Sequence, residues 1–167
     1  NLGDLSVLVK KSSADVGFAQ DPDADRAAIV DENGNAIGED LSLVLAIQNV
    51  LSRSEALEGP VVVNLSTSRM VEDVAKKFNR AVIRSKIGEM HVVQTMKDSN
   101  AVIGGEGSGG IGAIWPQTTF CRDSITGIAL ILELMAHTGK NISELVAEIP
   151  KYEIVKAKKE LNDLSEL

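Results

Sequence analysis

The sequence is poor in cysteine, in aromatic residues and in long apolar runs. Cys121 is the only cysteine among 167 residues, so an internal disulfide is impossible and a reduced, cytoplasmic setting is the simplest expectation. Aromatic residues make up 3% of the chain, which argues against base-stacking platforms and aromatic cages. No apolar run approaches the ~20 residues that a membrane-spanning helix needs. Residues 1–11 are amphipathic and do not resemble a secretory signal.

Positive charge is also in short supply. The chain has 17 Lys and Arg against 24 Asp and Glu, which gives a net charge of −7. Nucleic-acid binding requires clustered Lys and Arg, so we expect no nucleic-acid partner, and the acidity favours cations instead. Hydrophobic residues at 44% and charged residues at 25% are typical of a globular protein with a buried core.

The order of apolar runs and turn signals predicts alternating strands and helices. Apolar residues repeat at helical spacing near the start of the chain, and β-branched runs alternate with amphipathic stretches further on. This order predicts an α/β architecture with strands between helices. The expected strands are 15–19, 27–30, 61–65, 81–84 and 101–103, the expected helices are 39–51, 68–79, 89–97, 123–137 and 143–148, and a glycine-rich loop is expected over 104–112.

The sequence predicts three regions. Gly59-Pro60 interrupts the pattern, which places a boundary near residues 54–60. Residues 1–55 contain too few elements for a complete domain of this class. Residues 56–150 form the main unit, and the charged tail 151–167 is predicted to be a linker.

The loop Asp21-Pro22-Asp23-Ala24-Asp25-Arg26 is the first candidate site. Its alternating carboxylates offer hard oxygen ligands around one cation, as Mg²⁺ prefers. The adjacent Arg26 is suited to holding a phosphate beside that metal. The simplest structural interpretation is a solvated acidic turn.

A calcium-binding loop is the alternative of a different class. An EF-hand loop starts with D-x-D-x-D and has an acid at its twelfth position, which is Glu32 when counted from Asp21. However, Arg26 occupies the sixth position, where such loops have glycine, and the flanking runs are strand-like. A non-catalytic Ca²⁺-binding or structural module over Asp21–Glu32 therefore stays the second interpretation.

The second candidate is Gly104-Gly105-Glu106-Gly107-Ser108-Gly109-Gly110. It contains G-x-G-x-x-G after a strand, but Gly112 and Pro116 oppose the helix that a dinucleotide-binding fold requires next. A flexible backbone that presents Glu106 and Ser108 suits a polyhydroxylated ligand instead. An ordinary glycine-rich connection is the structural alternative.

Two further positions are weaker when taken from the residues alone. Asp123, after Arg122, stands at the start of a long predicted helix and could serve only as its cap. Lys86 lies beside a glycine turn and would by itself be a surface lysine.

Together these motifs resemble the α-D-phosphohexomutase family, which includes phosphoglucomutase/phosphomannomutase and phosphoglucosamine mutase. D-P-D-A-D-R and G-G-E-G-S-G-G lie about 80 residues apart, and the pair is more specific than either motif. Pro22 and Ala24 replace glycines common in the family, and Gly110 replaces a frequent histidine. Further likeness comes from residues 63–68, Gly88-Glu89 with Val92-Val93, Arg122-Asp123, Leu145 and 150–152.

The resemblance implies a three-layer α-β-α fold with a mixed sheet, preceded by a partial copy of a similar domain. Residues 1–55 would be the end of a second domain, 56–150 a third domain, and 151–167 the linker toward a fourth. The implied substrate is a hexose phosphate and the implied cofactor is Mg²⁺. The roles implied are metal binding for Asp21, Asp23 and Asp25, catalysis for Arg26 and Lys86, and substrate binding for Glu106, Ser108, Arg122 and Asp123.

The resemblance also implies the activity of a whole protein. Family members interconvert hexose 1-phosphate and 6-phosphate through a phosphoserine and a bisphosphate intermediate, which makes them isomerases. These 167 residues contain no Thr-x-Ser-His-Asn-Pro-like nucleophile loop and no basic phosphate-binding loop of a fourth domain. We therefore expect this chain alone to be inactive, and we expect its partial first domain to expose apolar surface that favours self-association.

Overall fold

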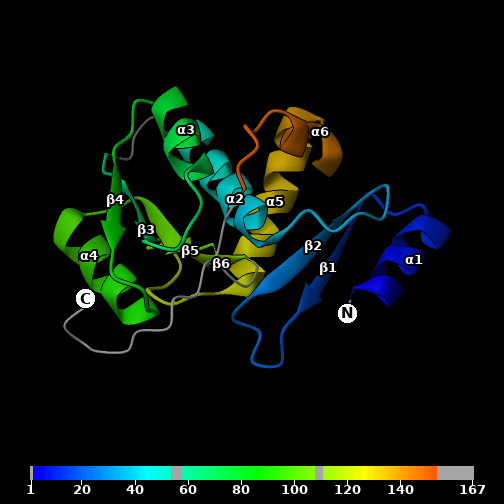
Figure 1. The fold of residues 1–167 in the computed structure, drawn as a ribbon, viewed down its shortest axis with the longest axis horizontal. Coiled ribbons are helices and arrows are strands. Elements are labelled where there is room, and N and C mark those ends of the chain that lie inside the picture. Colours follow the sequence, from blue (N-terminus) through cyan, green and yellow to red (C-terminus); the bar gives the residue numbers. More distant parts are fainter. Residues whose placement is uncertain (1, 54–57, 108–110, 154–167) are drawn as a thin grey trace, which may run out of the picture.

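The computed structural model describes residues 2–53, 58–107 and 111–153. A small unit comes first: α1 (Gly3–Ser12) precedes β1 (Val16–Gln20) and β2 (Ala27–Asp31), which pair antiparallel with Val16 opposite Asp31. Figure 1 shows this hairpin and α1 to one side of a larger body. No helix among the described residues combines the length and hydrophobicity that crossing a bilayer requires.

The larger body is built on a four-stranded mixed sheet in the order β4-β3-β5-β6. β3 (Val61–Asn64) pairs parallel with β4 (Val82–Ser85) and with β5 (Ile103–Glu106), whereas β6 (Gly112–Ile114) runs antiparallel to β5. The helices are α2 (Glu39–Arg53), α3 (Met70–Lys77), α4 (Glu89–Ser99), α5 (Ser124–Thr138) and α6 (Ile142–Ala147).

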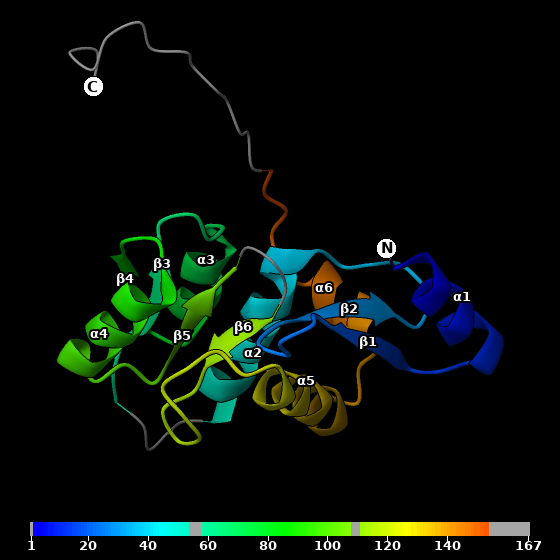
Figure 2. The same cartoon turned by 90° about the horizontal axis from the view of Figure 1, so that it is seen from below.

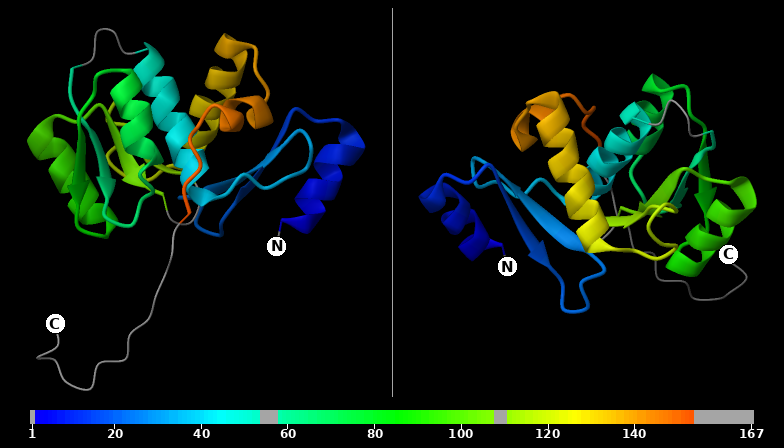
Figure 3. Two further views of the ribbon diagram at one scale, coloured as in Figure 1. Left: turned by 45° about the horizontal axis from the view of Figure 1, so that its top comes forward. Right: turned by 180° about the vertical axis from the view of Figure 1, so that it is seen from behind.

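Burial along β3 explains the three layers. Val61 and Val63 point into the main core, which they share with α2, α3 and α5, while Val62 packs with Val92 and Met96 of α4 on the other face. A strand covered on both faces is apolar throughout, as the Val61-Val62-Val63 run is. Figure 3 shows α3, α2 and α5 side by side on one face of the sheet and α4 on the other. The predicted α/β/α fold with a mixed sheet is therefore confirmed.

The glycine-rich segment differs from its prediction, because its first three residues form strand β5 and its last begins strand β6. A Cβ on Gly104 would lie 2.6 Å from the Val62 carbonyl oxygen and 2.5 Å from the Met96 sulfur. Glycine is needed here for close approach inside the sheet rather than for loop freedom. The sequence did not predict β6 at all, since a three-residue strand rich in small residues has little signal of its own.

Helix α2 belongs to the core of the larger body. Its buried residues, including Leu43, Leu45 and Ile47, join the cluster formed with β3 and β5. The helix therefore lies before the boundary expected at 54–60 but packs with the elements after it.

The hairpin is attached to the larger body at several points. The Ile111 amide donates to the Ala27 carbonyl over 2.8 Å, and Glu32 accepts hydrogen bonds from Ser143 at the start of α6. Figure 2 shows β1 and β2 beside α5 and α6. This placement brings the loop between β1 and β2 toward the start of α5.

Candidate functional site

The three acids of the β1–β2 loop converge. One carboxylate oxygen from each of Asp21, Asp23 and Asp25 lies within 4.8 Å of the others. The turn that brings them together is closed by the Ala24 amide, which donates to the Asp21 carbonyl over 3.0 Å, and Ala24 has a left-handed φ of 58°. These oxygens are the ligand type and spacing that a divalent cation accepts.

Arg26 braces this cluster, which we call the cation loop (residues 21–26). Its Nε lies 2.8 Å from Asp21 Oδ2 and 3.2 Å from Asp25 Oδ1, and its amide donates to Asp21 Oδ1 over 3.1 Å. Desolvation acts to raise the pKa of Asp21, but the Arg26 hydrogen bonds outweigh it and lower the pKa. Asp21 is thus held in its charged form.

Asp25 behaves differently from Asp21. Burial raises its pKa above the usual value of 3.8, and the charges of Asp21 and Asp23 add to the effect, while the Arg122 guanidinium opposes it. A divalent cation close to this carboxylate would oppose that rise. The three converging carboxylate oxygens are the ligand type that such a cation prefers, so the residues present fit a metal such as Mg²⁺.

Glu106 ends β5 at the carboxyl edge of the sheet and is 7% exposed. Its Oε1 accepts hydrogen bonds from the Asn64 side-chain amide at 2.7 Å and from the Gly88 amide at 2.9 Å, and its Oε2 lies 3.3 Å from Arg122 Nη1. A buried carboxylate needs such partners. These three partners also fix the orientation of the Glu106 carboxylate, whose Oε2 can accept a further hydrogen bond.

The residue after Glu106 is held as well. The Gly107 amide donates to Thr67 Oγ1 over 3.0 Å, and that hydroxyl donates to Asn64 Oδ1 over 2.9 Å. Thus Asn64, at the end of β3, anchors both Glu106 and the segment that follows it. Ser108, the other predicted sugar-binding residue, lies outside the described residues.

Arg122 and Asp123 are brought to the site but are already engaged. Asp123 caps α5: its Oδ1 accepts from the Ile125 amide at 2.9 Å and its Oδ2 from Thr126 Oγ1 at 2.6 Å. Arg122 forms ion pairs with Asp25, Glu89 and Glu106. Arg122 therefore joins the two predicted motifs.

Lys86 lies in the loop between β4 and α4 and is exposed. The same loop reaches Glu106 through the Gly88 amide. The structure thus brings the segment that carries Lys86 to the edge of the site, and the lysine itself is exposed.

Sequence reasoning gave no role to three supporting residues, Asn64, Thr67 and Glu89, although they lie in segments noted for their likeness to the family. The signal that could have found them is positional, because side chains after parallel strands gather at one edge of a sheet. Asn64 ends β3, and Glu89 follows β4 by four positions. Thr67 follows Asn64 by three positions and supports Gly107.

Glu32 lies at the opposite end of β2 from the cation loop. Its carboxylate accepts hydrogen bonds from the Ser143 hydroxyl and amide and from Asn33 Nδ2. The calcium-binding alternative requires Glu32 to be a ligand of the same ion as Asp21, so this arrangement does not favour it.

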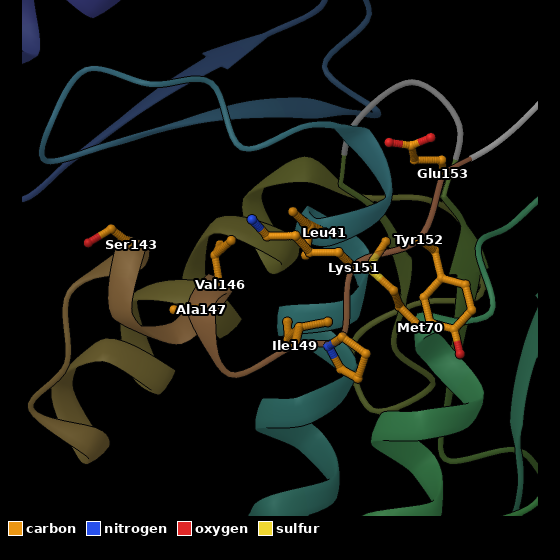
Figure 4. A pocket seen from close by; sticks show the side chains of 10 residues that line it. Leu41, Met70, Ser143, Val146, Ala147, Ile149, Lys151, Tyr152 and Glu153 are labelled. Carbon is orange, nitrogen blue, oxygen red and sulfur yellow. The ribbon is translucent and has the colours of Figure 1, made fainter.

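A pocket of about 640 Å³ lies elsewhere, between α2, α3, α6 and the segment after α6. Figure 4 shows Leu41, Met70 and Ile149 on its wall beside Tyr152. None of the predicted site residues lines it. The converging polar groups at the sheet edge, rather than this apolar hollow, therefore mark the candidate site.

The fold and this edge define an α/β/α domain with an acidic cation loop beside it. The chain belongs to the phosphoglucomutase/phosphomannomutase family: the model of its α/β/α domain III matches residues 38–152, and that of its domain II matches residues 1–34. The resemblance noted from the sequence is confirmed. The two matches meet between residues 34 and 38, before α2 rather than after it.

Named relatives cover the chain almost completely. A phosphoglucomutase/phosphomannomutase from Thermococcus kodakarensis is 39% identical over 95% of this chain and 34% of its own length. A phosphoglucosamine/phosphogalactosamine mutase from Sulfurisphaera tokodaii is 32% identical over 96% of this chain and 35% of its own. The chain thus spans about a third of the length of these relatives.

A solved structure shares the fold. A phosphoglucomutase/phosphomannomutase family protein from Burkholderia thailandensis superposes with a TM-score of 0.75 and 24% identity, over 90% of this chain and 32% of that one.

Proposed function

We propose that this chain is part of an α-D-phosphohexomutase, an isomerase that interconverts the 1-phosphate and 6-phosphate of a hexose. The observation that carries the proposal is the convergence of the two motifs: Arg122 contacts Asp25 of the cation loop and Glu106 of the glycine-rich segment. This contact brings two motifs that are far apart in the sequence close together, which supports the proposal because metal-assisted phosphoryl transfer on a sugar needs both near the same substrate.

The cation loop is the proposed Mg²⁺ site, with Asp21, Asp23 and Asp25 as its ligands. The chemistry that a bound Mg²⁺ supplies is stabilisation of negative charge on a transferring phosphoryl group. Arg26 orients two of these carboxylates through Nε and is 37% exposed at its side chain. We assign its exposed guanidinium to the phosphoryl group beside the loop.

Glu106 is the proposed acceptor for sugar hydroxyls, and Ser108 is proposed to bind beside it. Asn64 and Gly88 hold one Glu106 oxygen, so a sugar hydroxyl would donate to a carboxylate whose orientation is already fixed. Lys86 is proposed as a general acid or base, since its loop borders Glu106 and an exposed lysine can approach a bound ligand. Direct substrate contacts by Arg122 and Asp123 remain a prediction.

The proposed domain boundary follows the packing of α2. The residues up to and including the hairpin are assigned to the second domain, and α2 is assigned to the third, because its apolar residues complete the third-domain core. Residues from 151 onward are proposed to be the linker toward a fourth domain. A cytoplasmic setting stays a prediction from the single cysteine.

The test is an activity assay of a longer chain, extended at both ends with its native sequence. We expect it to interconvert the 1- and 6-phosphates of glucose, mannose or glucosamine with Mg²⁺, and we expect the 167-residue chain to be inactive. Activity on none of the sugars would refute the proposal, and turnover by the short chain would refute the predicted inactivity.

A substitution connects that activity to the site. Glu106→Gln in the long chain removes the charge that strengthens its hydrogen bonds, a loss of ~1.5–3 kcal/mol or about 10- to 100-fold in kcat/KM. The control is Glu148→Gln, which changes a glutamate in a surface ion pair with Lys140. Equal activities of the two variants would remove Glu106 from the site.

A further inference from the structure

The start of α5 holds the cation loop at two points. The Arg122 guanidinium pairs with Asp25 Oδ2, and the buried Ser124 hydroxyl donates to the Ala24 carbonyl over 2.7 Å. The same hydroxyl accepts from Gln20 Nε2 at 2.7 Å. The position of the cation loop is therefore set by α5 as well as by its own hairpin.

The same arginine reaches two acids at the edge of the sheet. Arg122 Nη1 lies 3.3 Å from Glu106 Oε2, and its backbone amide donates to Glu89 Oε1 over 2.7 Å. Its Nε lies 3.3 Å from Glu89 Oε2 as an ion pair without hydrogen-bond geometry. The Arg122 side chain is 20% exposed, so these pairs are only partly screened by solvent.

Gly112 provides the space for this arrangement. A Cβ on Gly112 would lie 3.1 Å from Arg122 Cδ, which is closer than most such contacts in proteins. The absence of a side chain at the start of β6 thus lets the guanidinium lie between the cation loop and Glu106. The Arg122 guanidinium is thus shared among the carboxylates of Asp25, Glu89 and Glu106, which come from segments far apart in the chain.

We propose that Arg122 is a positioning residue that couples cation binding at Asp25 to the strength of the ion pair between Arg122 and Glu106. The inference rests on the cation site proposed above. A cation that neutralises Asp25 weakens the attraction between Asp25 and Arg122, and the guanidinium then pairs more strongly with Glu106 and Glu89. Linkage is reciprocal. If a bound cation changes the affinity of Glu106 for a ligand by some factor, that ligand changes the affinity of the cation loop for the cation by the same factor.

The experiment titrates the 167-residue chain, nitrogen-labelled for NMR, with MgCl₂. Two amides serve as reporters, since the Arg26 amide donates to Asp21 and the Gly88 amide donates to Glu106. We expect both resonances to shift with one Mg²⁺ dissociation constant. In Arg122→Met the Arg26 resonance still shifts, because the three acids remain, but the Gly88 shift is lost.

Two further variants control this result. Arg122→Lys keeps the positive charge but replaces the planar guanidinium, which can reach several carboxylates, by a single ammonium, so an intermediate Gly88 shift is expected. If Arg122→Met loses the native spectrum, the Gly88 shift of Arg122→Lys decides the test. Arg80 lies before β4, at the end of the strand away from Glu106. The Arg26 and Gly88 resonances of Arg80→Met should therefore shift with Mg²⁺ as in the unaltered chain.

Three outcomes overturn the inference. A Gly88 shift of undiminished size in Arg122→Met, or in Arg122→Lys where Arg122→Met has lost the native spectrum, shows that the coupling does not pass through this side chain. A silent Gly88 beside a responsive Arg26 in the unaltered chain shows that no coupling exists, and it leaves the proposed function intact. An Arg26 resonance that never responds removes the cation site itself, and the inference with it.

Discussion

Asn64 shows what one buried amide does at the edge of the sheet. The residue is fully buried, its Nδ2 donates to Glu106, and its Oδ1 accepts from the Ser66 amide and hydroxyl and from Thr67 Oγ1. Every polar atom of the side chain is therefore used. Loss of the side chain would leave buried Glu106 and buried Thr67 each without one hydrogen-bond partner.

We predict that Asn64→Ala lowers the free energy of unfolding by about 1–3 kcal/mol, the cost of leaving buried polar groups unsatisfied. Urea unfolding of the chain measures this loss. The matched control is Ser66→Ala, which removes an exposed hydroxyl from the same acceptor and should change stability by about 0.5 kcal/mol or less. Similar losses in the two variants would contradict the role given to Asn64.

At the scale of one element, α5 depends on how it begins. Asp123 has an extended backbone and accepts from the Ile125 amide, which is the geometry of an N-cap. The helix that it starts supplies Leu130, Ile131 and Leu134 to the main core. The cap therefore fixes both a core helix and the position of Arg122 beside it.

Asp123→Ala is expected to lower the free energy of unfolding by ~1 kcal/mol, as loss of an N-cap does. Denaturant unfolding followed by circular dichroism measures it. Asp98→Ala is the control, since an acid near the end of α4 opposes the helix dipole and its removal should not destabilise the chain. A loss at Asp98 as large as that at Asp123 would show that the cap is unimportant.

At the scale of the whole molecule, Glu32 joins the hairpin to α6. Burial acts to raise the pKa of Glu32, but the hydrogen bonds from Ser143 and Asn33 outweigh it and lower the pKa below its usual value of 4.5. The folded state thus binds the Glu32 proton more weakly than the unfolded state. The resulting stability is present above pH 4.5 and is lost as the pH falls through the lowered pKa.

Glu32→Gln should therefore make the unfolding free energy less dependent on pH below about that value, with little further change above it. Thermal or urea unfolding across a pH series measures this. Glu58→Gln, at an exposed glutamate before β3, should keep the pH dependence of the unaltered chain. If Glu32→Gln and the unaltered chain lose stability in parallel on acidification, the link to Ser143 contributes nothing.

The exposed surface of α1 bears on assembly. Val7 and Leu8 are 65% and 59% exposed on this helix, which packs against the two hairpin strands. A two-stranded sheet with one helix is a small unit by itself. Self-association of this chain stays a prediction, and the position of these side chains is consistent with it.

Much of the fold followed from local pattern. The type of an element can be predicted where it depends on residues that are neighbours in the sequence. This holds for β3, with its Val61-Val62-Val63 run, and for α5, with its apolar stripe, and both predictions were confirmed. β6 and the place of α2 could not be predicted in this way, because pairing with β5 and packing in a distant core are not encoded in either segment alone.

The sequence by itself determined the chemistry available: three alternating acids, an arginine after them, and a glutamate within a glycine-rich segment. These motifs were enough for the family. The tertiary structure decided how they act together, because only folding places Arg122 between Asp25 and Glu106 and Asn64 beneath Glu106. Residue types follow from the chain directly, but ion pairs and hydrogen bonds depend on distances that the packing of the sheet, the hairpin and α5 sets.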